Sequence, residues 1–529
     1  MTVRTGPLLL FSMGIAAQGA GCQLMVQIRD FIDGAWTTLR RSNASVLKSA
    51  ADDKVAKTGD AIVYVPRDLA LDEIQEDLRR QLTEDEFRKV QVLPLPEAGE
   101  PSKPGLLFLP YPYVVPGGRF NEMYGWDSYF ILRGLLQDGQ LELAKNMTDN
   151  QIFEVEHYGK VLNANRSYYL TRSQPPFLAA MVLETYKRTN DLEWLKGTLP
   201  ALENYYSYWT REPHLTQASG LSHYDGGADT PAPEVIESER DISGRNDYER
   251  IRRYFKAHHV SRYDLSRFYD RAQDRLTPLF YRADRAMRES GFDPSSRFGP
   301  FSAGIVDYDP VDLNSLLYRM ETDLSAIHAE LGQRDQAALW ASRAQGRAEK
   351  INRLMWDDKE GLYFDYNFRE GARSNYRYLT TFYPLWVGIA SQAQAARVAG
   401  NIHLFERAGG LQTSTQSSGD QWDAPFGWAP LQLIAVEGLR RYGFEEAADR
   451  VSVKFLSMVL DDFKKHGTIR EKYNVVNGRS DLSAGLRFGY ATNEIGFGWT
   501  NAAFLVLYDK LSPRGRDKFE RVCGQLTAH

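Results

Sequence analysis

The sequence predicts an all-α fold in which paired helices close into a toroid, with short β-hairpins and long loops at one end. Three features support this prediction. Amphipathic segments of helical length dominate from about residue 176 onward, strand signals are few and short, and glycine- and tryptophan-rich connections separate the helices. A stack of simple helical repeats is the alternative, but its connections would be less elaborate. The loops at one end of a toroid can form a closed-sided pocket.

The first residues have the character of an export signal. Arg4 supplies a weak positive charge, residues 7–17 are apolar, and small residues precede Cys22. Cys22 is also a poor match to a lipoprotein attachment site, because Gly19 stands where Leu is usual. The alternative is an ordinary N-terminal extension that packs as a short apolar segment. We therefore expect residues 1–22 to be a signal peptide and the protein to be periplasmic or secreted, and otherwise cytoplasmic.

A lead-in segment is predicted at residues 23–110, packed on the barrel, before a single helical domain at residues 111–529. Residues 68–88 have helical periodicity, and residues 94–112 are rich in proline and glycine and should be extended. No linker divides the rest of the chain.

The predicted helices share an apolar face at helical spacing. They are residues 176–188, 191–209, 312–331, 333–355, 379–397, 430–442, 444–463 and 499–511. The first begins with a proline at its entrance, and the second should break near Pro200. The third and fourth should form an antiparallel pair joined at Gly332. Residues 361–366 are the clearest strand.

Composition excludes several functional classes. The net charge of −5, the pI near 6.1 and the lack of a long basic run give no reason to expect nucleic acid as a partner. The nine histidines are scattered and form no metal-binding motif, so no metal site is expected. Two cysteines, Cys22 and Cys523, cannot form a disulfide framework that organises the fold. No later apolar run reaches the roughly 20 residues that span a bilayer.

Two clusters of aromatic and polar residues carry the functional signal. Residues 116–130 contain three glycines, an arginine, two acids and five aromatic residues, and residues 421–430 have the same character. Aromatic rings stack on the C–H faces of a sugar, while Arg and Asp bind its hydroxyls. The clusters lie about 300 residues apart, so a large fold must bring them together.

Both clusters resemble the signature sequences of the trehalase family, glycoside hydrolase family 37. The first matches Pro-Gly-Gly-Arg-Phe-x-Glu-x-Tyr-x-Trp-Asp-Ser-Tyr, and the second matches Gln-Trp-Asp-x-Pro-x-Gly-Trp-x-Pro, with Phe426 where Asn is usual. Blocks at residues 163–176, 289–293, 471–473 and 496–501 lie between and after the two clusters, and they also resemble blocks of the family, in the order of the family. The resemblance implies an (α/α)6 barrel that hydrolyses the disaccharide α,α-trehalose with inversion and without a cofactor. We expect a monomer.

Glycoside hydrolysis needs two carboxyl groups, one on each side of the anomeric carbon. The resemblance implies that Asp293 is the general acid and Glu471 the general base. The alternatives are a turn or helix-capping role for Asp293 and a surface ion pair of Glu471 with Lys472 or Arg470. For an inverting enzyme the carboxyls should lie roughly 6.5–9.5 Å apart, which leaves room for a water molecule.

The resemblance also implies a set of substrate-binding residues: Arg119, Trp126, Asp127, Asn163, Arg172, Gln174, Glu234, Gly291, Trp422 and Asp423. Several of these residues also have a purely structural interpretation. The two tryptophans are candidates for the core, Arg119 and Asp127 for a structural ion pair, and Arg172 for a helix cap.

Two blocks of the family are altered. Ala232 replaces an arginine that precedes Pro-Glu, and Arg240 is a candidate substitute. Residues 486–488 are bulky where the family has glycines, and Tyr490 stands in the place of a substrate-binding glutamate. A hydrogen bond to a charged group is worth about 1.5–3 kcal/mol, so loss of this arginine and this glutamate would weaken the binding of trehalose. The substrate can therefore differ from trehalose. The alternatives are a hydrolase of another α-glucoside, such as glucosylglycerate, and a non-catalytic sugar-binding relative.

Overall fold

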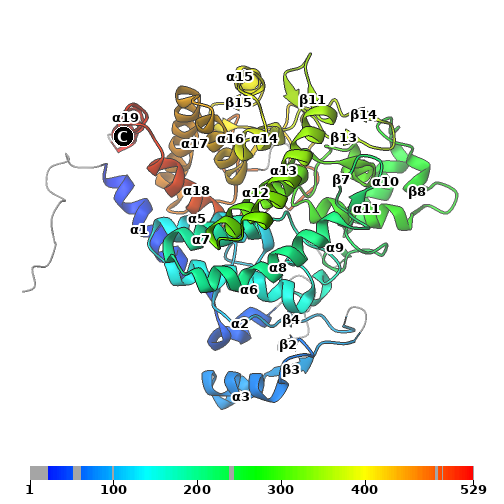
Figure 1. Cartoon of the computed structure of the whole chain (residues 1–529), viewed down its shortest axis with the longest axis vertical. Coiled ribbons are helices and arrows are strands. Elements are labelled where there is room, and N and C mark those ends of the chain that lie inside the picture. The colour runs from blue at the N-terminus through cyan, green and yellow to red at the C-terminus, as the bar shows by residue number, and fades with distance from the viewer. Residues whose placement is uncertain are drawn as a thin grey trace, which may run out of the picture.

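A computed structural model describes residues 22–51, 61–97, 101–236, 244–482, 486–490 and 492–527. Within these residues, six helices form a closed ring in which each packs on the next and the last packs on the first. They are α5 (Gly125–Gln137), α7 (Leu178–Thr189), α12 (Val311–Glu330), α14 (Tyr383–Val387), α16 (Ala429–Arg441) and α18 (Gly498–Asp509). Figure 1 shows this ring from the side.

Each inner helix is followed in sequence by an outer helix. The outer helices are α6 (Leu141–Tyr158), α8 (Leu192–Thr210), α13 (Arg334–Leu354), α15 (Gln392–Gly400), α17 (Glu445–His466) and α19 (Pro513–Thr527). The pairs α5–α6, α7–α8, α12–α13 and α16–α17 pack directly against each other. The prediction of an (α/α)6 toroid is therefore confirmed.

Two predicted helix boundaries were wrong. Helix α8 continues through Pro200, because buried Leu195 and Tyr205 anchor it on both sides of the proline and outweigh the missing hydrogen bond. The segment at 379–397 is instead divided. Helix α14 ends at Gly388, whose φ is 91°, and α15 begins after Ser391, which forms a capping box with Gln394.

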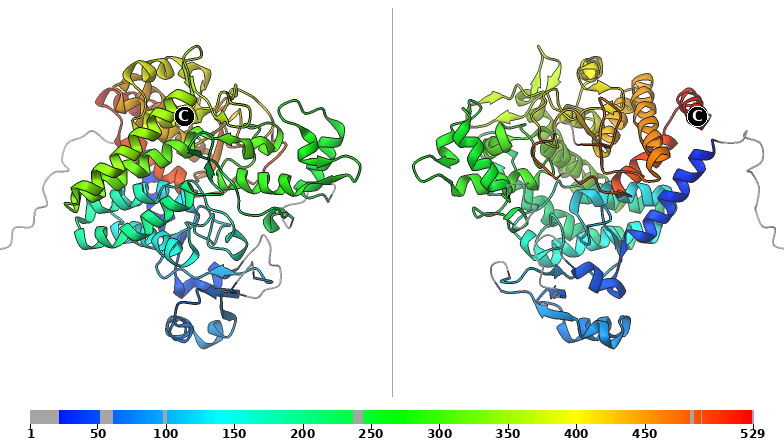
Figure 2. Two further views of the ribbon diagram at one scale, coloured as in Figure 1. Left: turned by 45° about the vertical axis from the view of Figure 1, so that its right-hand side comes forward. Right: turned by 180° about the vertical axis from the view of Figure 1, so that it is seen from behind.

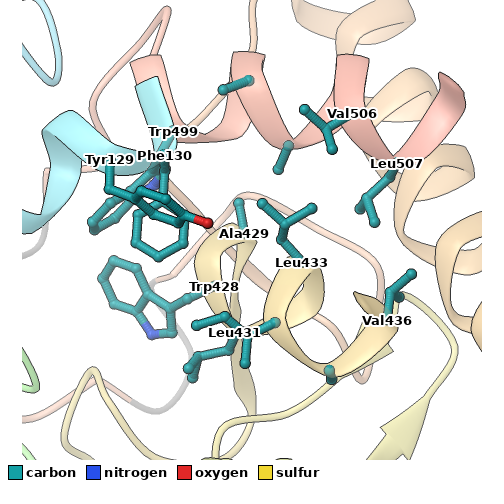
Figure 3. Close-up of a cluster of buried hydrophobic side chains, with 14 of the residues drawn as sticks. Tyr129, Phe130, Trp428, Ala429, Leu431, Leu433, Val436, Trp499, Val506 and Leu507 are labelled. Carbon is teal, nitrogen blue, oxygen red and sulfur yellow. The ribbon is translucent and has the colours of Figure 1, made fainter. Parts of the chain in front are cut away.

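The main core lies between the inner helices. Figure 3 shows part of this core, with Tyr129 and Phe130 of α5, Leu433 of α16 and Val506 of α18 among the side chains drawn. The inner helices are apolar on most of their surface because they have neighbours on all sides. The ring is therefore a rigid support for the loops that begin and end its helices.

Helix α1 (Gln23–Thr38), at the start of the predicted lead-in, packs directly on the barrel. It packs on α17, α18 and α19, and its Ile28, Ile32 and Trp36 are part of the main core. A disulfide between Cys22 and Cys523 joins the start of α1 to α19, which lie side by side in Figure 2. A lipid attached to Cys22 is incompatible with this bond. The predicted signal peptide falls on residues 1–21, which lie outside the described residues.

A parallel three-stranded sheet, which the sequence did not predict, follows α1. Its strands are β2 (Ala61–Val65), β3 (Val90–Pro94) and β4 (Leu106–Leu107), in the order β3-β2-β4. The predicted helix at 68–88 is α3 (Leu71–Gln81) plus α4 (Glu84–Phe87). Buried Val63, Leu78 and Phe108 form a separate small core, and Figure 1 shows this unit below the barrel. The domain boundary at residue 110 stays a prediction.

The remaining helices and strands lie before α5 or in the connections between the ring helices. Among the helices these are α2 (Val46–Ala50), α9 (Pro233–Ile236), α10 (Asp247–Ala257) and α11 (Pro278–Glu289). The paired strands are β1 (Arg40–Arg41) with β5 (Tyr113–Val114), β6 (Leu215–Thr216) with β7 (Leu221–Ser222), β8 (Tyr269–Asp270) with β9 (Arg275–Leu276), β11 (Trp356–Asp357) with β12 (Leu362–Tyr363), and β15 (Glu406–Arg407) with β16 (Gly410–Leu411). A small sheet has the order β10 (Tyr308–Asp309), β13 (Tyr366–Asn367), β14 (Ala372–Arg373). The predicted strand at 361–366 is thus split between β12 and β13. Among the described residues, no helix combines the length and the apolarity that crossing a bilayer requires.

Candidate active site

A cavity of about 620 Å³ lies where the two sequence clusters meet. Inner helices α5 and α18 both begin at this cavity, with Trp126 and Trp499 in their first turns. All but one of the predicted site residues line it: Arg119, Trp126, Asp127, Asn163, Arg172, Gln174, Glu234, Gly291, Asp293, Trp422 and Glu471. The structure thus brings together residues that are separated by more than three hundred positions in the sequence.

Pairing of two short strands brings the second cluster beside Glu471. Strand β17 (Phe426–Trp428) pairs antiparallel with β18 (Lys472–Asn474), with Trp428 opposite Lys472. The backbone N–H of Glu471 donates to the carbonyl of Glu494, and the indole of Trp499 donates to the carbonyl of Glu471 at 3.1 Å. The backbone of Glu471 is therefore held from both sides.

Gln421 connects the two predicted catalytic segments. Its side-chain N–H donates to the backbone carbonyl of Asp293, and its side-chain carbonyl accepts from Nζ of Lys472 at 3.1 Å. The backbone N–H of Trp422 also donates to the carbonyl of Pro294, at 3.1 Å. The second cluster consequently fixes the loop of Asp293 as well as the strand that follows Glu471.

A cluster of packed indoles lies at one wall of the cavity, which Trp126, Trp422 and Trp499 border. Trp422 stacks on Trp428 with ring centroids 3.8 Å apart, and Trp126 lies 5.6 Å from Trp422 and 5.9 Å from Trp499. Trp126 and Trp422 are 2% and 3% exposed. Each ring therefore packs in the core and also borders the cavity, and the role of both in binding a sugar stays a prediction.

Gly291 is required by the close packing of this wall. Its φ is +77°, and a Cβ at this position would lie 2.9 Å from the indole of Trp126. A side chain would be strained by the backbone and would also displace the ring. The glycine thus allows the loop that carries Asp293 to approach Trp126.

Asp293 follows the end of α11 and projects into the cavity. Oδ2 of Asp293 lies 3.4 Å from Nη1 of Arg288 on the same helix. Although 34% of the side chain is open to the cavity, burial raises the pKa of Asp293 to about 6, against the lowering effect of Arg288 and Arg172. Such a carboxyl can hold a proton in weakly acidic solution, as a general acid must.

Glu471 is buried rather than exposed, with 1% of its side chain accessible. Oε1 accepts a hydrogen bond from the hydroxyl of Tyr490. Oε2 lies 3.5 Å from Nζ of Lys472 but accepts no hydrogen bond from any described residue. Burial lowers the pKa of Lys472 to about 8, although the charge of Glu471 opposes the shift. The alternative interpretation of Glu471 was an ion pair with Lys472 at the protein surface. The pair is present, but both side chains are buried.

Arg172 and Glu234 form a buried ion pair on the cavity wall. Burial raises the pKa of Glu234, but the guanidinium of Arg172 outweighs it and holds that pKa below its usual range. Nε and Nη1 of Arg172 and Oε2 of Glu234 have no hydrogen-bond partner among the described residues. Buried polar atoms of this kind are costly unless a ligand or water satisfies them. Arg172 pairs with Glu234 at the cavity, and α7, the helix that follows it, has no side-chain cap.

Three further predicted residues shape the walls. Oε1 of Gln174 accepts from the backbone N–H of Trp126 at 2.9 Å, at the start of α5. Nδ2 of Asn163 donates to the carbonyl of Arg288 at 3.2 Å. Nε of Arg119 lies 3.2 Å from Oε1 of Glu494. These contacts align the loops around the cavity while leaving each residue on its surface.

Asp423 is the predicted site residue that does not border the cavity. It is fully buried and accepts hydrogen bonds from the backbone N–H of Ser296 at 2.9 Å and the hydroxyl of Tyr376 at 2.8 Å. Burial raises its pKa. Asp423 therefore fastens the loop after Asp293 through Ser296 and is not part of the cavity lining.

Sequence reasoning missed several residues of the cavity, including Arg288 and Arg250. Arg288 lies five residues before Asp293, and that nearness was the available signal, but its helix has the spacing of a solvent-facing amphipathic segment. Arg250 on α10 gave no signal. Ala232 is fully buried, and the candidate substitute Arg240 lies outside the described residues.

The altered segment 486–490 forms another part of the wall. Leu486, Arg487 and Tyr490 border the cavity, as expected of bulky residues in place of glycines. Phe488 turns away and packs on Phe301, with ring centroids 4.7 Å apart. The segment is thus anchored outside the cavity and presents Tyr490 inside it.

Comparisons with known proteins point in one direction. The sequence profile of the trehalase family matches residues 32–512. The cytosolic neutral trehalase of Neurospora crassa is 36% identical over 543 residues, which cover 89% of this chain and 71% of the relative. The cytosolic neutral trehalase of Saccharomyces cerevisiae is 37% identical over 451 residues, or 78% of this chain and 59% of the relative. The solved structure of neutral trehalase Nth1 from S. cerevisiae superposes with a TM-score of 0.79 at 32% identity, over 95% of this chain and 96% of that chain.

Proposed function

The chain belongs to the trehalase family and is a glycoside hydrolase, and we propose that it hydrolyses α,α-trehalose to two glucose molecules with inversion. The observation that carries the proposal is the pair of carboxyls in one cavity. Asp293 has a pKa raised to about 6, whereas the charge of Glu471 is matched by buried Lys472. One carboxyl is thus suited to give a proton and the other to take one.

The two carboxyls act in a single displacement. A water oxygen attacks the anomeric carbon while its proton passes to Oε2 of Glu471, the oxygen that no described residue hydrogen-bonds. The bond from that carbon to the glycosidic oxygen breaks, and Asp293 gives its proton to the leaving oxygen. No covalent intermediate forms, and no cofactor takes part.

The polar residues of the wall bind the sugar hydroxyls. Arg172 and Glu234 offer two guanidinium nitrogens and one carboxylate oxygen that lack partners among the described residues. Charge-assisted hydrogen bonds from such pre-aligned groups are short and directional. Trp126 and Trp422 supply the apolar face on which a pyranose ring packs. The other proposed sugar-binding groups are Arg119, Asp127, Asn163, Gln174 and the backbone of Gly291. Asp423 does not border the cavity and instead holds the loop after Asp293.

Arg288 replaces the guanidinium that is missing at Ala232. It borders the cavity, lies 3.4 Å from Asp293, and is also held by Asp284 at 3.1 Å. A guanidinium anchored in this way can bind a sugar hydroxyl and control the proton of Asp293 together. The loss at Ala232 therefore does not remove positive charge from the site.

The proposal is tested by steady-state kinetics of the purified chain on α,α-trehalose and on glucosylglycerate. A higher kcat/KM for trehalose supports it. A preference for glucosylglycerate would show that the altered segment 486–490 has changed the substrate. Binding of trehalose without release of glucose would instead identify a sugar-binding relative.

The compartment and the oligomeric state are separate questions. The names of the relatives support a cytoplasmic location and do not support the periplasmic or secreted one predicted from the first residues. The Cys22–Cys523 disulfide points the other way, because the cytosol keeps thiols reduced. Alkylation of free thiols in freshly lysed cells, followed by mass spectrometry of both cysteines, decides between them. The expected monomer stays a prediction.

A further inference from the structure

Tyr490 occupies a position between charged groups at the edge of the cavity. Nζ of Lys472 lies 3.5 Å from the centroid of its ring, and the guanidinium carbon of Arg119 lies 4.8 Å from that centroid. Nζ of Lys472 also lies 3.4 Å from the backbone carbonyl of Tyr490. Cations over an aromatic face attract the ring, most strongly where water is excluded. These contacts hold the ring in one orientation.

That orientation directs the hydroxyl of Tyr490 to Oε1 of Glu471, to which it donates a hydrogen bond. Burial, followed by the charge of Glu471, raises the pKa of Tyr490 well above its usual value. The hydroxyl therefore remains protonated and remains a donor over the working range of a hydrolase. A carboxylate with one oxygen held in this way has lost its freedom to rotate about its last bond.

The second oxygen of Glu471 is left for chemistry. Oε2 accepts no hydrogen bond from the described residues, and Lys472 is its nearest charged neighbour at 3.5 Å. The two oxygens differ because the hydroxyl of Tyr490 holds Oε1, whereas Lys472 approaches Oε2. Without the hydroxyl, the carboxylate could turn and offer either oxygen to Lys472.

We propose that Tyr490 is a positioning residue for the general base, which fixes Oε1 of Glu471 so that Oε2 receives the proton of the attacking water. This inference rests on the proposed roles of Glu471 and Asp293. The proposal also assigns a role to Tyr490, which stands where the family has a substrate-binding glutamate. A second carboxylate at this position would repel Glu471, whereas a phenol stabilises its charged form.

The test is Tyr490→Phe, which removes the hydroxyl and keeps the ring between Lys472 and Arg119. Loss of a hydrogen bond to a charged group should lower kcat on trehalose by about tenfold to a hundredfold, with a smaller change in KM. The acid limb of the kcat/KM profile should also move to higher pH by about one unit, because removal of a donor favours the protonated carboxyl. The other charged groups near Glu471 and Tyr490, which are Lys472, Arg119, Glu494 and Asp293, are unchanged in this variant.

Tyr206→Phe is the matched control. Its hydroxyl donates to Oε1 of buried Glu321 at 2.8 Å, in α8 and α12, and neither residue borders the cavity. This control should lose stability without any change in the pH profile. The position of a pH limb does not depend on the amount of folded enzyme, so a partly unfolded Tyr490→Phe sample still gives an answer.

Two different failures are distinguishable. If the wild-type chain releases no glucose from trehalose, the proposed function fails. If the wild type is active and Tyr490→Phe keeps both its kcat and its acid limb, the function stands and the role of Tyr490 is refuted. A fall in kcat with an unmoved acid limb would also refute it, since it would indicate a purely structural role.

Discussion

The side-chain amide of Gln421 donates a hydrogen bond to the backbone carbonyl of Asp293, across 128 positions of sequence. The same amide accepts from Lys472, whose ammonium lies beside Glu471. One side chain thus connects the loop of the general acid to the strand that follows the general base. The distance between the two carboxyls depends on this bridge, and an inverting enzyme needs a fixed distance.

Replacement of Gln421 by Ala should therefore lower activity as well as stability. The buried ammonium of Lys472 and the carbonyl of Asp293 lose a partner, which costs about 1–3 kcal/mol per buried group. We expect kcat to fall at least tenfold, measured by initial rates of glucose release. Gln432→Ala is the matched control, because Gln432 clamps both backbone groups of Leu411 outside the cavity. The control should lower Tm and leave kcat intact; equal kcat values for both variants would contradict this role of Gln421.

The raised pKa of Asp293 makes a prediction about pH. A general acid works only when protonated, so kcat/KM should decline as the pH rises through about 6. Arg288 lowers this pKa, and its removal in Arg288→Gln should shift the alkaline limb to higher pH, whatever happens to the maximal rate. Arg282→Gln on the same helix, whose guanidinium pairs with Asp225, is the control and should not move the limb. An unmoved or downward-shifted limb in Arg288→Gln would exclude Asp293 as the titrating acid.

Gly291→Ala should damage both stability and activity. The backbone at φ +77° disfavours a side chain, which costs about 1–3 kcal/mol, and the new Cβ would meet Trp126 at 2.9 Å. Gly467→Ala provides a comparison, since its φ is +66° but nothing lies within 4 Å. Both variants should lower Tm, but only Gly291→Ala should lower kcat/KM. An active Gly291→Ala enzyme would mean that the loop of Asp293 can move away from Trp126 without consequence.

The disulfide should stabilise the barrel without contributing to the reaction. It closes a loop of 501 residues and fastens α1 to α19, so its loss should cost about 2–4 kcal/mol. Thermal unfolding of Cys523→Ser should show a lower Tm than the oxidised wild type and the same Tm as the wild type in reductant. Identical unfolding of oxidised and reduced wild type would show that the bond is not formed in solution.

Local motifs predicted most of the site, because a motif specifies which residue types border the ligand. Trp126, Arg172 and Glu471 were identified in this way, and all line the cavity. The direction of a side chain in a loop is decided by distant packing, which a motif does not contain. Asp423 was therefore assigned to the cavity although it points behind it, and the contact of Tyr490 with Glu471 was not foreseen.

In the fold, too, local sequence patterns were predicted well and features that depend on distant packing were missed. Long helices with a strong apolar face, such as α12 and α17, were predicted to within a few residues. The continuation of α8 through Pro200 was missed, because burial of Leu195 and Tyr205 is a tertiary effect. The parallel sheet of β2, β3 and β4 was missed because its strands are short and distant in sequence. Pairing of Cys22 with Cys523 likewise depends on the closure of the whole ring.

The most direct test of the account is proton NMR of the purified protein with α,α-trehalose, with both glucose anomers followed at early times. One glucose inverts on attack by water and the other leaves unchanged, so equal initial amounts of β- and α-glucose are predicted. Asp293→Asn and Glu471→Gln should slow their release roughly a hundredfold to ten-thousandfold. Release of α-glucose alone, or no glucose from a folded protein, would contradict the proposed reaction.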